Sequence, residues 1–418
     1  MTIRIYYDPI HGEINLDSKN PEEEMIIRLI DCPAFQRLRR IKQLGPASLL
    51  FHGAESSRFT HSLGVFHIAR KTLSKLKLID QSIEKSKYIL YGASLLHDIG
   101  HGPLSHTSEE IFNHNHEEWS KKLITEHEPI LNILQDYQDN LPESIGEILI
   151  NSTNKLSPIN SLISSQLDCD RLDYMIRDTY NTGLKYGKVD IERIISALTI
   201  TPDGDMAITP KGIIAVEHYF VMRDMMYRSV YNHRLNEISN WILEKIIKSA
   251  RETKLKDIWI DKYFAELINN DNSMDINSFI CNDDIRTYYH ILRWGEDGPK
   301  QLSTLCRMFL DRDLLKGIDI KDFNYTDRLK ILAIARQHTE LNNLDPNIYC
   351  GIKSKQFQAY KKNDKSLRIW DGKCLMAIED ISPLVKSLQT LKESSWLIYP
   401  KIINKQITTE INNMKGIL

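Results

Sequence analysis

The sequence predicts a mainly α-helical protein, in which a helical bundle is followed by a smaller C-terminal α+β lobe. Apolar residues recur at helical spacing over long tracts of the first two thirds of the chain, where strand-like stretches are few. After about residue 275 the histidines become sparse and the pattern becomes mixed. We therefore expect a core of residues 1–275, which includes a short N-terminal strand pair, and a lobe of residues 276–418 that serves regulation or assembly.

The elements are expected in the following order. Two short strands should come first, because residues 1–17 alternate in polarity around the turn sequence Asp8–Gly12. A helix should begin at Pro21, since proline followed by three glutamates is typical of a helix start. Apolar periodicity then predicts helices at 59–78, 87–97, 119–125, 143–151, 159–180 and 213–249, and an Asn and Asp cluster predicts a loop at 269–272. In the C-terminal lobe we expect helices at 280–292 and 302–315 and strands at 330–335, 367–377 and 395–403.

Composition and charge narrow the class of protein. Of the 418 residues, 42% are apolar and 26% are charged, as in ordinary globular proteins. Lys and Arg total 54 against 56 Asp and Glu, so no net positive field attracts nucleic acids or anionic membranes. The six cysteines form no Cys-x-x-Cys pair, and no segment resembles a secretion signal or a membrane span. We therefore expect a cytoplasmic protein with free thiols and no membrane partner.

Histidines cluster in one part of the chain. Seven of the fourteen lie within 56 residues, at positions 61, 67, 97, 101, 106, 114 and 116. His97 and Asp98 end a predicted apolar helix that glycines then break, and His61 and Asp170 lie on other predicted helices. Adjacent side chains on a helix point about 100° apart, so both reach one ion only beside the helix end, where imidazole and carboxylate suit a divalent metal. The alternative for an isolated pair is that Asp98 only orients a core histidine.

Five sequence blocks resemble a known family. A His, then His-Asp, then Asp is the pattern of the HD superfamily of metal-dependent phosphohydrolases. The five blocks are Asp8–Gly12, Phe35–Gly45, Arg58–Gly64, His97–His106 and Asp170–Asp178. In this order they also resemble the deoxynucleoside triphosphate triphosphohydrolases, over roughly residues 4–240. The resemblance implies an HD-domain helical bundle.

The resemblance implies four ligands for a divalent metal, which is Mn, Fe, Zn or Mg. They are His61, His97, Asp98 and Asp170. Helical spacing agrees with Asp170, because Tyr174 and Asp178 follow on its face at offsets of four and eight. Asp168 and Asp173 are expected instead to be solvated or salt-bridged carboxylates.

The reaction implied is hydrolysis of a deoxynucleoside triphosphate (dNTP) to a deoxynucleoside and triphosphate. It needs a metal to activate water, an acid for the leaving 5′ oxygen and cations for the phosphates. The residues implied for proton transfer are His101, His106, Glu109 and His116. His106 takes the acid role, and Glu109, one helical turn later, can orient its ring, although the family usually carries Asp there. His67 and His114 are expected to be surface or packing residues.

The resemblance also implies a site for the dNTP substrate. Three arginines neutralise the triphosphate, and residues around the sugar select deoxyribose by leaving no room at C2′. The implied substrate residues are Gln43, Leu44, Arg58, Arg171, Tyr174, Asp178, Arg223 and Tyr231. For Tyr231 the alternative is a core aromatic residue at helical spacing from Tyr227.

Regulated members of the family bind an activating guanine nucleotide between subunits. A GTP or dGTP activator and a homo-oligomer, either a dimer or a tetramer, are therefore implied. The matching positions are Arg4, Asp31, Gln36, Arg39 and Arg307. At a second basic position across the interface this chain has Ser303. The alternative is that Asp31 and Arg39 form an ordinary ion pair at a helix start.

Two other functions stay open on the sequence alone. One is another HD phosphohydrolase, a phosphodiesterase or a nucleoside monophosphatase, although the three arginines argue against it because a monophosphate needs fewer cations. The other is a nucleic-acid-binding protein or nuclease, which the basic run Arg37–Lys42 favours. The neutral overall charge and the lack of interleaved aromatic residues limit this to weak, salt-sensitive binding.

Overall fold

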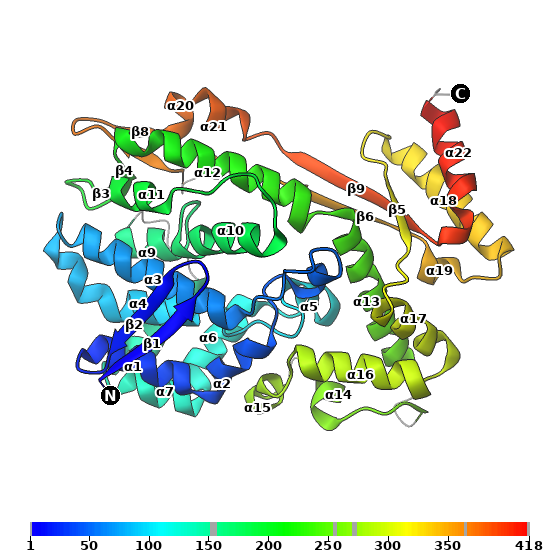
Figure 1. The fold of residues 1–418 in the computed structure, drawn as a ribbon, viewed down its shortest axis with the longest axis horizontal. Coiled ribbons are helices and arrows are strands. Elements are labelled where there is room, and N and C mark those ends of the chain that lie inside the picture. The colour runs from blue at the N-terminus through cyan, green and yellow to red at the C-terminus, as the bar shows by residue number, and fades with distance from the viewer. Residues whose placement is uncertain (1, 151–156, 254–256, 270–273, 363–365, 416–418) are drawn as a thin grey trace. The chain divides into compact units, whose positions relative to one another are not determined.

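The computed structural model of the chain describes residues 2–150, 157–253, 257–269, 274–362 and 366–415 (Figure 1). They form two compact units, each assembled from segments that are distant in sequence. The first comprises Met1–Met226, Lys262–Thr287 and Ala359–Gln389, and the second Tyr227–Asp261, Tyr288–Gln358 and Thr390–Leu418. The predicted mainly α-helical fold with small C-terminal sheets is confirmed. The division at residue 275 stays a prediction.

The first unit begins with the predicted strand pair. β1 (Ile3–Asp8) and β2 (Gly12–Asp17) are antiparallel partners joined by a tight turn. Ile14 and Leu16 alternate along β2 and are fully buried. Burial of one face of β2 therefore fixes the hairpin against the helices, since an isolated two-stranded hairpin is only marginally stable.

Helices make up most of the first unit. They are α1 (Pro21–Asp31), α2 (Pro33–Gln36), α3 (Arg58–Leu76), α4 (Lys87–Leu96), α5 (His106–Phe112), α6 (His116–Glu126), α7 (Glu128–Gln135), α8 (Leu141–Ile150), α9 (Pro158–Ile163), α10 (Cys169–Thr182), α11 (Ile191–Ala197), α12 (Ile213–Met226), α14 (Lys262–Asn269), α15 (Ile276–Ile280), α20 (Ile378–Ile381) and α21 (Pro383–Ser387). The helices predicted at 59–78, 87–97 and 119–125 match α3, α4 and α6. Residue 151 of a predicted helix and residues 270–272 of the predicted loop lie outside the described residues.

Two long predicted helices are divided in the structure. The 159–180 tract is interrupted because Asp168 adopts extended geometry and caps the start of α10 with its side chain. The 213–249 tract passes from α12 into a π-helical turn at Tyr227–Tyr231, after which His233 caps the following helix. Apolar periodicity continues across both interruptions, so only the capping residues mark them.

A small sheet in the first unit joins distant segments of the chain. Its strands are β3 (Leu198–Ile200), β4 (Met206–Ile208), β7 (Arg368–Trp370) and β8 (Leu375–Ala377), in that order. β4 and β7 are parallel, and the other pairs are antiparallel. The single strand predicted at 367–377 is therefore two strands joined by a turn.

The second unit combines helices with a three-stranded antiparallel sheet. Its elements are α13 (Arg234–Glu252), the C-terminal part of α16 (Asp284–Asp297), α17 (Lys300–Leu310), β5 (Lys316–Asp319), α18 (Tyr325–Leu341), α19 (Pro346–Tyr349), β6 (Gly351–Phe357), β9 (Lys392–Tyr399) and α22 (Asn404–Lys415). The sheet order is β5-β9-β6. Its core contains Ile331, Leu397 and Ile407. Among the described residues, no helix combines the length and apolarity needed to cross a membrane.

The strand predicted at 330–335 is wrong, because these residues lie inside α18. Asn324 caps the helix start, and Ile331, Ala335 and Thr339 are buried at a spacing of four residues. A short apolar run does not by itself distinguish a buried strand from one buried face of a helix. The cap and the longer periodicity decide in favour of the helix.

Candidate active site

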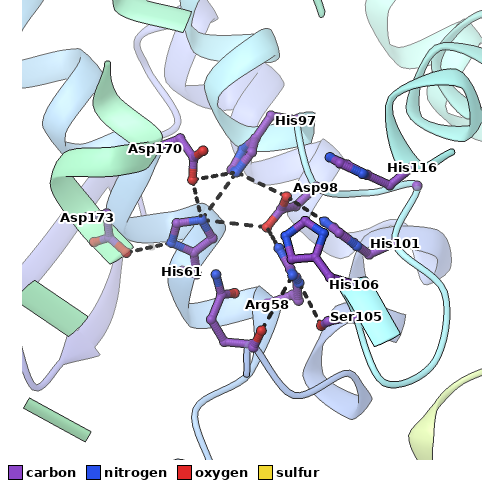
Figure 2. Close-up of polar contacts among 12 residues, drawn as sticks. Arg58, His61, His97, Asp98, His101, Ser105, His106, His116, Asp170 and Asp173 are labelled. Atoms are coloured by element: carbon purple, nitrogen blue, oxygen red, sulfur yellow. Dashed lines mark hydrogen bonds and ion pairs between the residues drawn. The ribbon is translucent and has the colours of Figure 1, made fainter. Parts of the chain in front are cut away.

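Four side chains from three helices of the first unit lie close together, and ligand atoms of three of them, His61, His97 and Asp170, all lie within 4.8 Å of one another (Figure 2). His61 lies on α3, His97 and Asp98 follow the last turn of α4, and Asp170 lies in the first turn of α10. The Nε2 atom of His61 is 3.0 Å from Asp170 Oδ1 and 3.3 Å from His97 Nε2. Asp98 Oδ2 lies 3.6 Å from the same nitrogen. Two imidazoles and two carboxylates at these distances suit a divalent metal ion.

Local packing orients His97. Because a carbonyl oxygen only accepts, His97 donates from Nδ1 to Ser94 O at 2.9 Å, which leaves Nε2 facing the other side chains. The chain then passes directly against α6 at Gly100, where a Cβ would lie 2.2 Å from both His116 O and Ser120 N. The first glycine of the His97–His106 block is therefore required by close packing.

Buried charges keep the carboxylates of this group ionised. Arg58 is 3% exposed and donates to Asp98 Oδ2 at 2.6 Å. Burial would raise the pKa of Asp98, but Arg58 and His97 lower it well below its usual range. Burial would also raise the pKa of Asp170, but its contacts with His61 and His97 lower it. Both side chains are therefore anionic near neutral pH, as ligands of a cation must be.

A second group beside the first contains the residues predicted for proton transfer. The ring of His101 stacks on that of His116 with centroids 4.0 Å apart, and His106 meets His101 edge-on at 4.8 Å. Glu109 accepts hydrogen bonds from Nδ1 of His116 and, at 3.4 Å, from Nδ1 of His106. The side chain of His106 is 68% exposed, whereas that of His101 is fully buried. The group therefore leads from the interior to the surface.

The protonation states in this second group differ from one residue to the next. Burial lowers the pKa of His101 well below its usual value, and the charges of Arg58 and His116 add to this effect. Burial would raise the pKa of Glu109, but hydrogen bonds from His106 and His116 lower it. A neutral imidazole and an ionised carboxylate thus lie beside exposed His106, as acid–base chemistry requires. In this second group, ligand atoms of His101, His106, Glu109 and His116 also lie within 4.8 Å of one another, a spacing that could hold a metal ion.

A pocket of about 140 Å³ connects the two groups. Asp98 lies at the junction, because its Oδ1 is 3.4 Å from His97 Nε2 and 3.3 Å from His101 Nε2. The lining residues are Gln43, Arg58, His97, Asp98, His101, His106, His116, Glu117, Leu149, Ile163, Ser164, Asp170 and Tyr174. The apolar lining residues Leu149 and Ile163 were not predicted, since nothing in the sequence separates them from core residues.

The predicted substrate residues are only partly brought together. Three of them line the pocket, namely Gln43, Arg58 and Tyr174. Within the described lining, Leu44, Arg171, Asp178 and Arg223 do not appear. Arg171 pairs with Asp168, so Asp168 is salt-bridged as the sequence suggested. Tyr231 belongs to the second unit, where its ring meets that of Tyr227 edge-on.

Asp173 is a site residue for which the sequence analysis predicted no contact with the metal ligands. It is fully buried and salt-bridged to Arg177, and it also accepts a hydrogen bond from His61 Nδ1 at 2.7 Å. Asp173 is therefore salt-bridged, which is one of the two states expected for it, and its contact with His61 is additional. The available signal was spacing, because Asp173 follows Asp170 by three residues on one helix and faces the same neighbour.

The residues predicted for an activating nucleotide lie in both units. Arg4 donates to Asp31 at 2.6 Å, with side chains 42% and 54% exposed. Asp31 thus pairs with Arg4, rather than with Arg39, in the part of the chain that the structure describes. Arg39 donates instead to Gln36 Oε1 at 2.8 Å. Arg307 lies on α17 of the second unit.

The basic run at 37–42 is not a continuous basic surface. Arg37 is fully buried and donates to three backbone carbonyls. Burial lowers its pKa to about 10. Arg40 pairs with Asp283 at 2.5 Å. These contacts weaken the case for a nucleic-acid-binding function.

Comparison with known proteins identifies two matching family models. The model described as the HD domain matches residues 58–175, and the model described as the HD associated region matches residues 189–406. The first range contains all four residues of the candidate metal site.

Two relatives illustrate the sequence similarity. The uncharacterized protein YwfO of Bacillus subtilis is 31% identical over 373 residues, which cover 88% of this chain and 83% of YwfO. The deoxynucleoside triphosphate triphosphohydrolase SAMHD1 of Gallus gallus is 27% identical over 287 residues. That match covers 59% of this chain and 45% of SAMHD1, so the chain spans less than half of this relative.

Two solved structures share the fold over nearly the whole chain. A phosphohydrolase from Bacteroides thetaiotaomicron has a TM-score of 0.81 at 26% identity and covers 96% of this chain and 100% of its own. A hypothetical protein from Aquifex aeolicus has a TM-score of 0.77 at 27% identity, with 98% and 100% covered.

Proposed function

Since this chain belongs to the HD-domain family of metal-dependent phosphohydrolases, we propose that its reaction is the hydrolysis of dNTPs to deoxynucleoside and triphosphate. The observation that carries the proposal is the position of Asp98 between the two groups of the site. One pocket thereby adjoins both a place for a cation and a set of imidazoles that ends at the exposed His106. The similarity to SAMHD1 supports the choice of dNTPs as substrate class.

In the proposed reaction a water oxygen adds to the α-phosphorus and the bond to the 5′ oxygen breaks. A divalent metal held by His61, His97, Asp98 and Asp170, whether Mn, Fe, Zn or Mg, would polarise a phosphoryl oxygen and make water a better nucleophile. His106 protonates the leaving 5′ oxygen, and the Glu109 carboxylate holds its ring and that of His116.

The proposal also assigns the contacts to the dNTP substrate. Arg58, Arg171 and Arg223 neutralise the triphosphate, while Tyr174 contacts the nucleotide in the pocket. The sugar is bounded by Gln43, Leu44, Asp178 and Tyr231, which leaves no room for a ribose 2′ hydroxyl.

Product analysis tests the proposed reaction. The protein is loaded separately with Mn, Fe, Zn or Mg and incubated with each dNTP, singly and in mixtures. Ion chromatography and reversed-phase chromatography should then resolve intact triphosphate and deoxynucleoside in equal amounts. Release of pyrophosphate or monophosphate, or turnover only of deoxynucleoside monophosphates or phosphodiesters, would overturn the proposal in favour of another HD phosphohydrolase.

Regulation by GTP or dGTP is part of the proposal. The activator is placed at Arg4, Asp31, Gln36 and Arg39, with Arg307 supplied across a homo-oligomer interface. Because Asp31 is already paired with Arg4, the nucleotide has to replace this contact. Turnover and mass are measured with and without nucleotide in wild type and in Asp31→Ala. Activation that survives the substitution, or no response in either measurement, would remove the site.

The remaining assignments follow from the same proposal. In this proposal the enzyme is cytoplasmic and acts on dNTPs as free nucleotides. Residues 276–418 then serve regulation or assembly, and any nucleic-acid binding is weak and salt-sensitive.

A further inference from the structure

We propose that Asp173 is a positioning residue for His61, and that the Asp8–His11 turn of the N-terminal hairpin holds Asp173 in place. The inference rests on the assignment of His61 as a metal ligand in the proposed function. It gives a role to the Asp8–Gly12 block, which no step of the reaction uses.

Asp173 fixes the tautomer of His61. This imidazole is fully buried, with Nδ1 2.7 Å from Asp173 Oδ2 and Nε2 3.0 Å from Asp170 Oδ1 (Figure 2). A carboxylate at Nδ1 fixes the proton on that nitrogen and leaves the Nε2 lone pair directed at the other ligands. A ligand that is ordered in advance in the correct tautomer binds a metal more tightly, because no reorientation opposes binding.

Asp173 is itself held by side chains from the hairpin, α10 and α3. Its Oδ1 accepts from His11 Nε2 at 2.6 Å and from Arg177 Nη2 at 3.0 Å. Its Oδ2 accepts from Arg177 Nε at 2.7 Å as well as from His61. The carboxylate is thus fully buried yet bonded on both oxygens, so its position is fixed by three side chains from three separate segments.

The turn between β1 and β2 contacts both Asp173 and Arg177. Asp8 Oδ1 accepts from the backbone N–H groups of Ile10 and His11, at 2.8 Å and 3.0 Å. This is the local pattern by which Asp shapes a tight turn. Asp8 Oδ2 accepts from Arg177 Nη1 at 2.8 Å. The turn therefore contacts Arg177 through Asp8 and Asp173 through His11.

Space for this arrangement is provided by Gly64, one helical turn after His61 on α3. A Cβ at this position would lie 2.0 Å from Asp173 Oδ1 and 2.5 Å from Arg177 Nη2. The last residue of the Arg58–Gly64 block is therefore the surface against which the carboxylate and guanidinium pack. Both blocks are accounted for by one buried contact between the hairpin, α3 and α10.

Metal affinity is the measurement that separates positioning from general stabilisation. The apparent Kd for Co²⁺ is measured by competition with a chelator, and the visible absorption of bound Co²⁺ reports the geometry of its ligands. Asp173→Asn should weaken Co²⁺ binding by about 10- to 100-fold and change the absorption spectrum. His11→Gln should shift both readouts in the same direction by a smaller factor, because it acts through Asp173.

Asp168→Asn is the matched control. It makes the same change at a buried carboxylate at the start of the same helix, where the side chain caps α10 and pairs with Arg171. It should leave Co²⁺ affinity and absorption unchanged. If Asp173→Asn does not fold, as judged by circular dichroism, His11→Gln and Asp8→Asn carry the test.

The outcomes distinguish this inference from the proposed function. Wild-type Co²⁺ affinity and absorption in folded Asp173→Asn would overturn the positioning role. An effect of Asp173→Asn without any effect of His11→Gln or Asp8→Asn would overturn the role of the turn. His61→Ala is measured in parallel, and undiminished Co²⁺ binding there would instead refute the metal site of the proposed function. No readout depends on which nucleotide is hydrolysed.

Discussion

The two groups of polar side chains in the site differ in how firmly they are held. His61 and His97 are each fixed at Nδ1 by an acceptor behind the ring, namely Asp173 and the carbonyl of Ser94. In the second group the rings of His106 and His116 share a single acceptor at Nδ1, Glu109, and His106 is largely exposed. A rigid set of ligands suits binding of one ion, whereas an exposed imidazole can exchange protons with substrate and water. The difference in rigidity therefore predicts which group binds the metal and which moves a proton.

The largest expected effect is in the rigid group. His97→Ala should remove bound metal and turnover together, because His97 is one of four side chains around a single point and a three-ligand remainder leaves the cation open to water. Metal content is measured by plasma mass spectrometry, and turnover by triphosphate release.

His52→Ala is the control for this substitution, since His52 is exposed and belongs to neither group. It should keep both properties. Full metal content in His97→Ala would show that the rigid group is not the metal site, and the two groups would then not differ in this way.

The next effect is in the exposed group. His106→Ala should lower turnover by roughly 10²- to 10⁴-fold, the usual contribution of a positioned acid, while metal content stays at the wild-type level. A fall in metal content with unchanged turnover per bound ion would make His106 a ligand, and the two groups would then share one task.

A smaller effect on turnover is expected for Glu109, which accepts hydrogen bonds from His106 and His116. Glu109→Gln keeps the shape but replaces ionised acceptors with a neutral one, so turnover should fall by about 10- to 100-fold through loss of charge-assisted hydrogen bonds to two histidines. Glu110→Gln, at the neighbouring exposed position, is the matched control. Equal rates for both variants would mean that Glu109 does not orient the acid.

The last expected effect is on stability and not on turnover, and it concerns His114, which packs beside the second group and has no assigned role in it. Burial lowers its pKa from 6.5 to about 4, so the unfolded chain binds more protons than the folded chain between these values. Its contribution to stability is therefore present above pH 6.5 and is lost as pH falls towards 4. Relative to His114→Gln, wild type should lose about 2 kcal/mol of unfolding free energy between pH 7.5 and pH 5.

Urea unfolding of both proteins at the two pH values measures this difference. Parallel losses in wild type and variant would assign the pH dependence to other groups. An effect on turnover larger than the effect on stability would place His114 in the proton-transfer group after all.

Much of the fold was predictable because its signals are local. The strand pair and helices α3, α4 and α6 follow from alternation, apolar periodicity and start signals within single segments. The strand prediction for residues 330–335 was wrong because an apolar run of this length fits either a strand or one face of α18. The break before α10 was not predicted because Asp168 acts through a side-chain cap, which does not interrupt the apolar pattern.

The site divides in the same way. The group around His61 was predictable because the His, His-Asp, Asp pattern identifies its members directly. Which carboxylate stands behind His61 was not, because Asp168 and Asp173 look alike in sequence and only the packing of α10 on α3 distinguishes them. Arg58 shows a related limit, since its residue type suits phosphate equally well but the structure pairs it with Asp98.

The contact between His11 and Asp173 also has a consequence for how the chain is made. These residues are 162 positions apart, so a ribosome adding about 5–20 residues per second finishes the hairpin roughly 8–30 s before Asp173 exists. During that interval the first residues of the chain lack the partner that their polar turn requires. The nascent N-terminus therefore stays without this partner until Asp173 has been made, and a translation product that ends before Asp170 lacks both this contact and one of the four side chains of the candidate metal site.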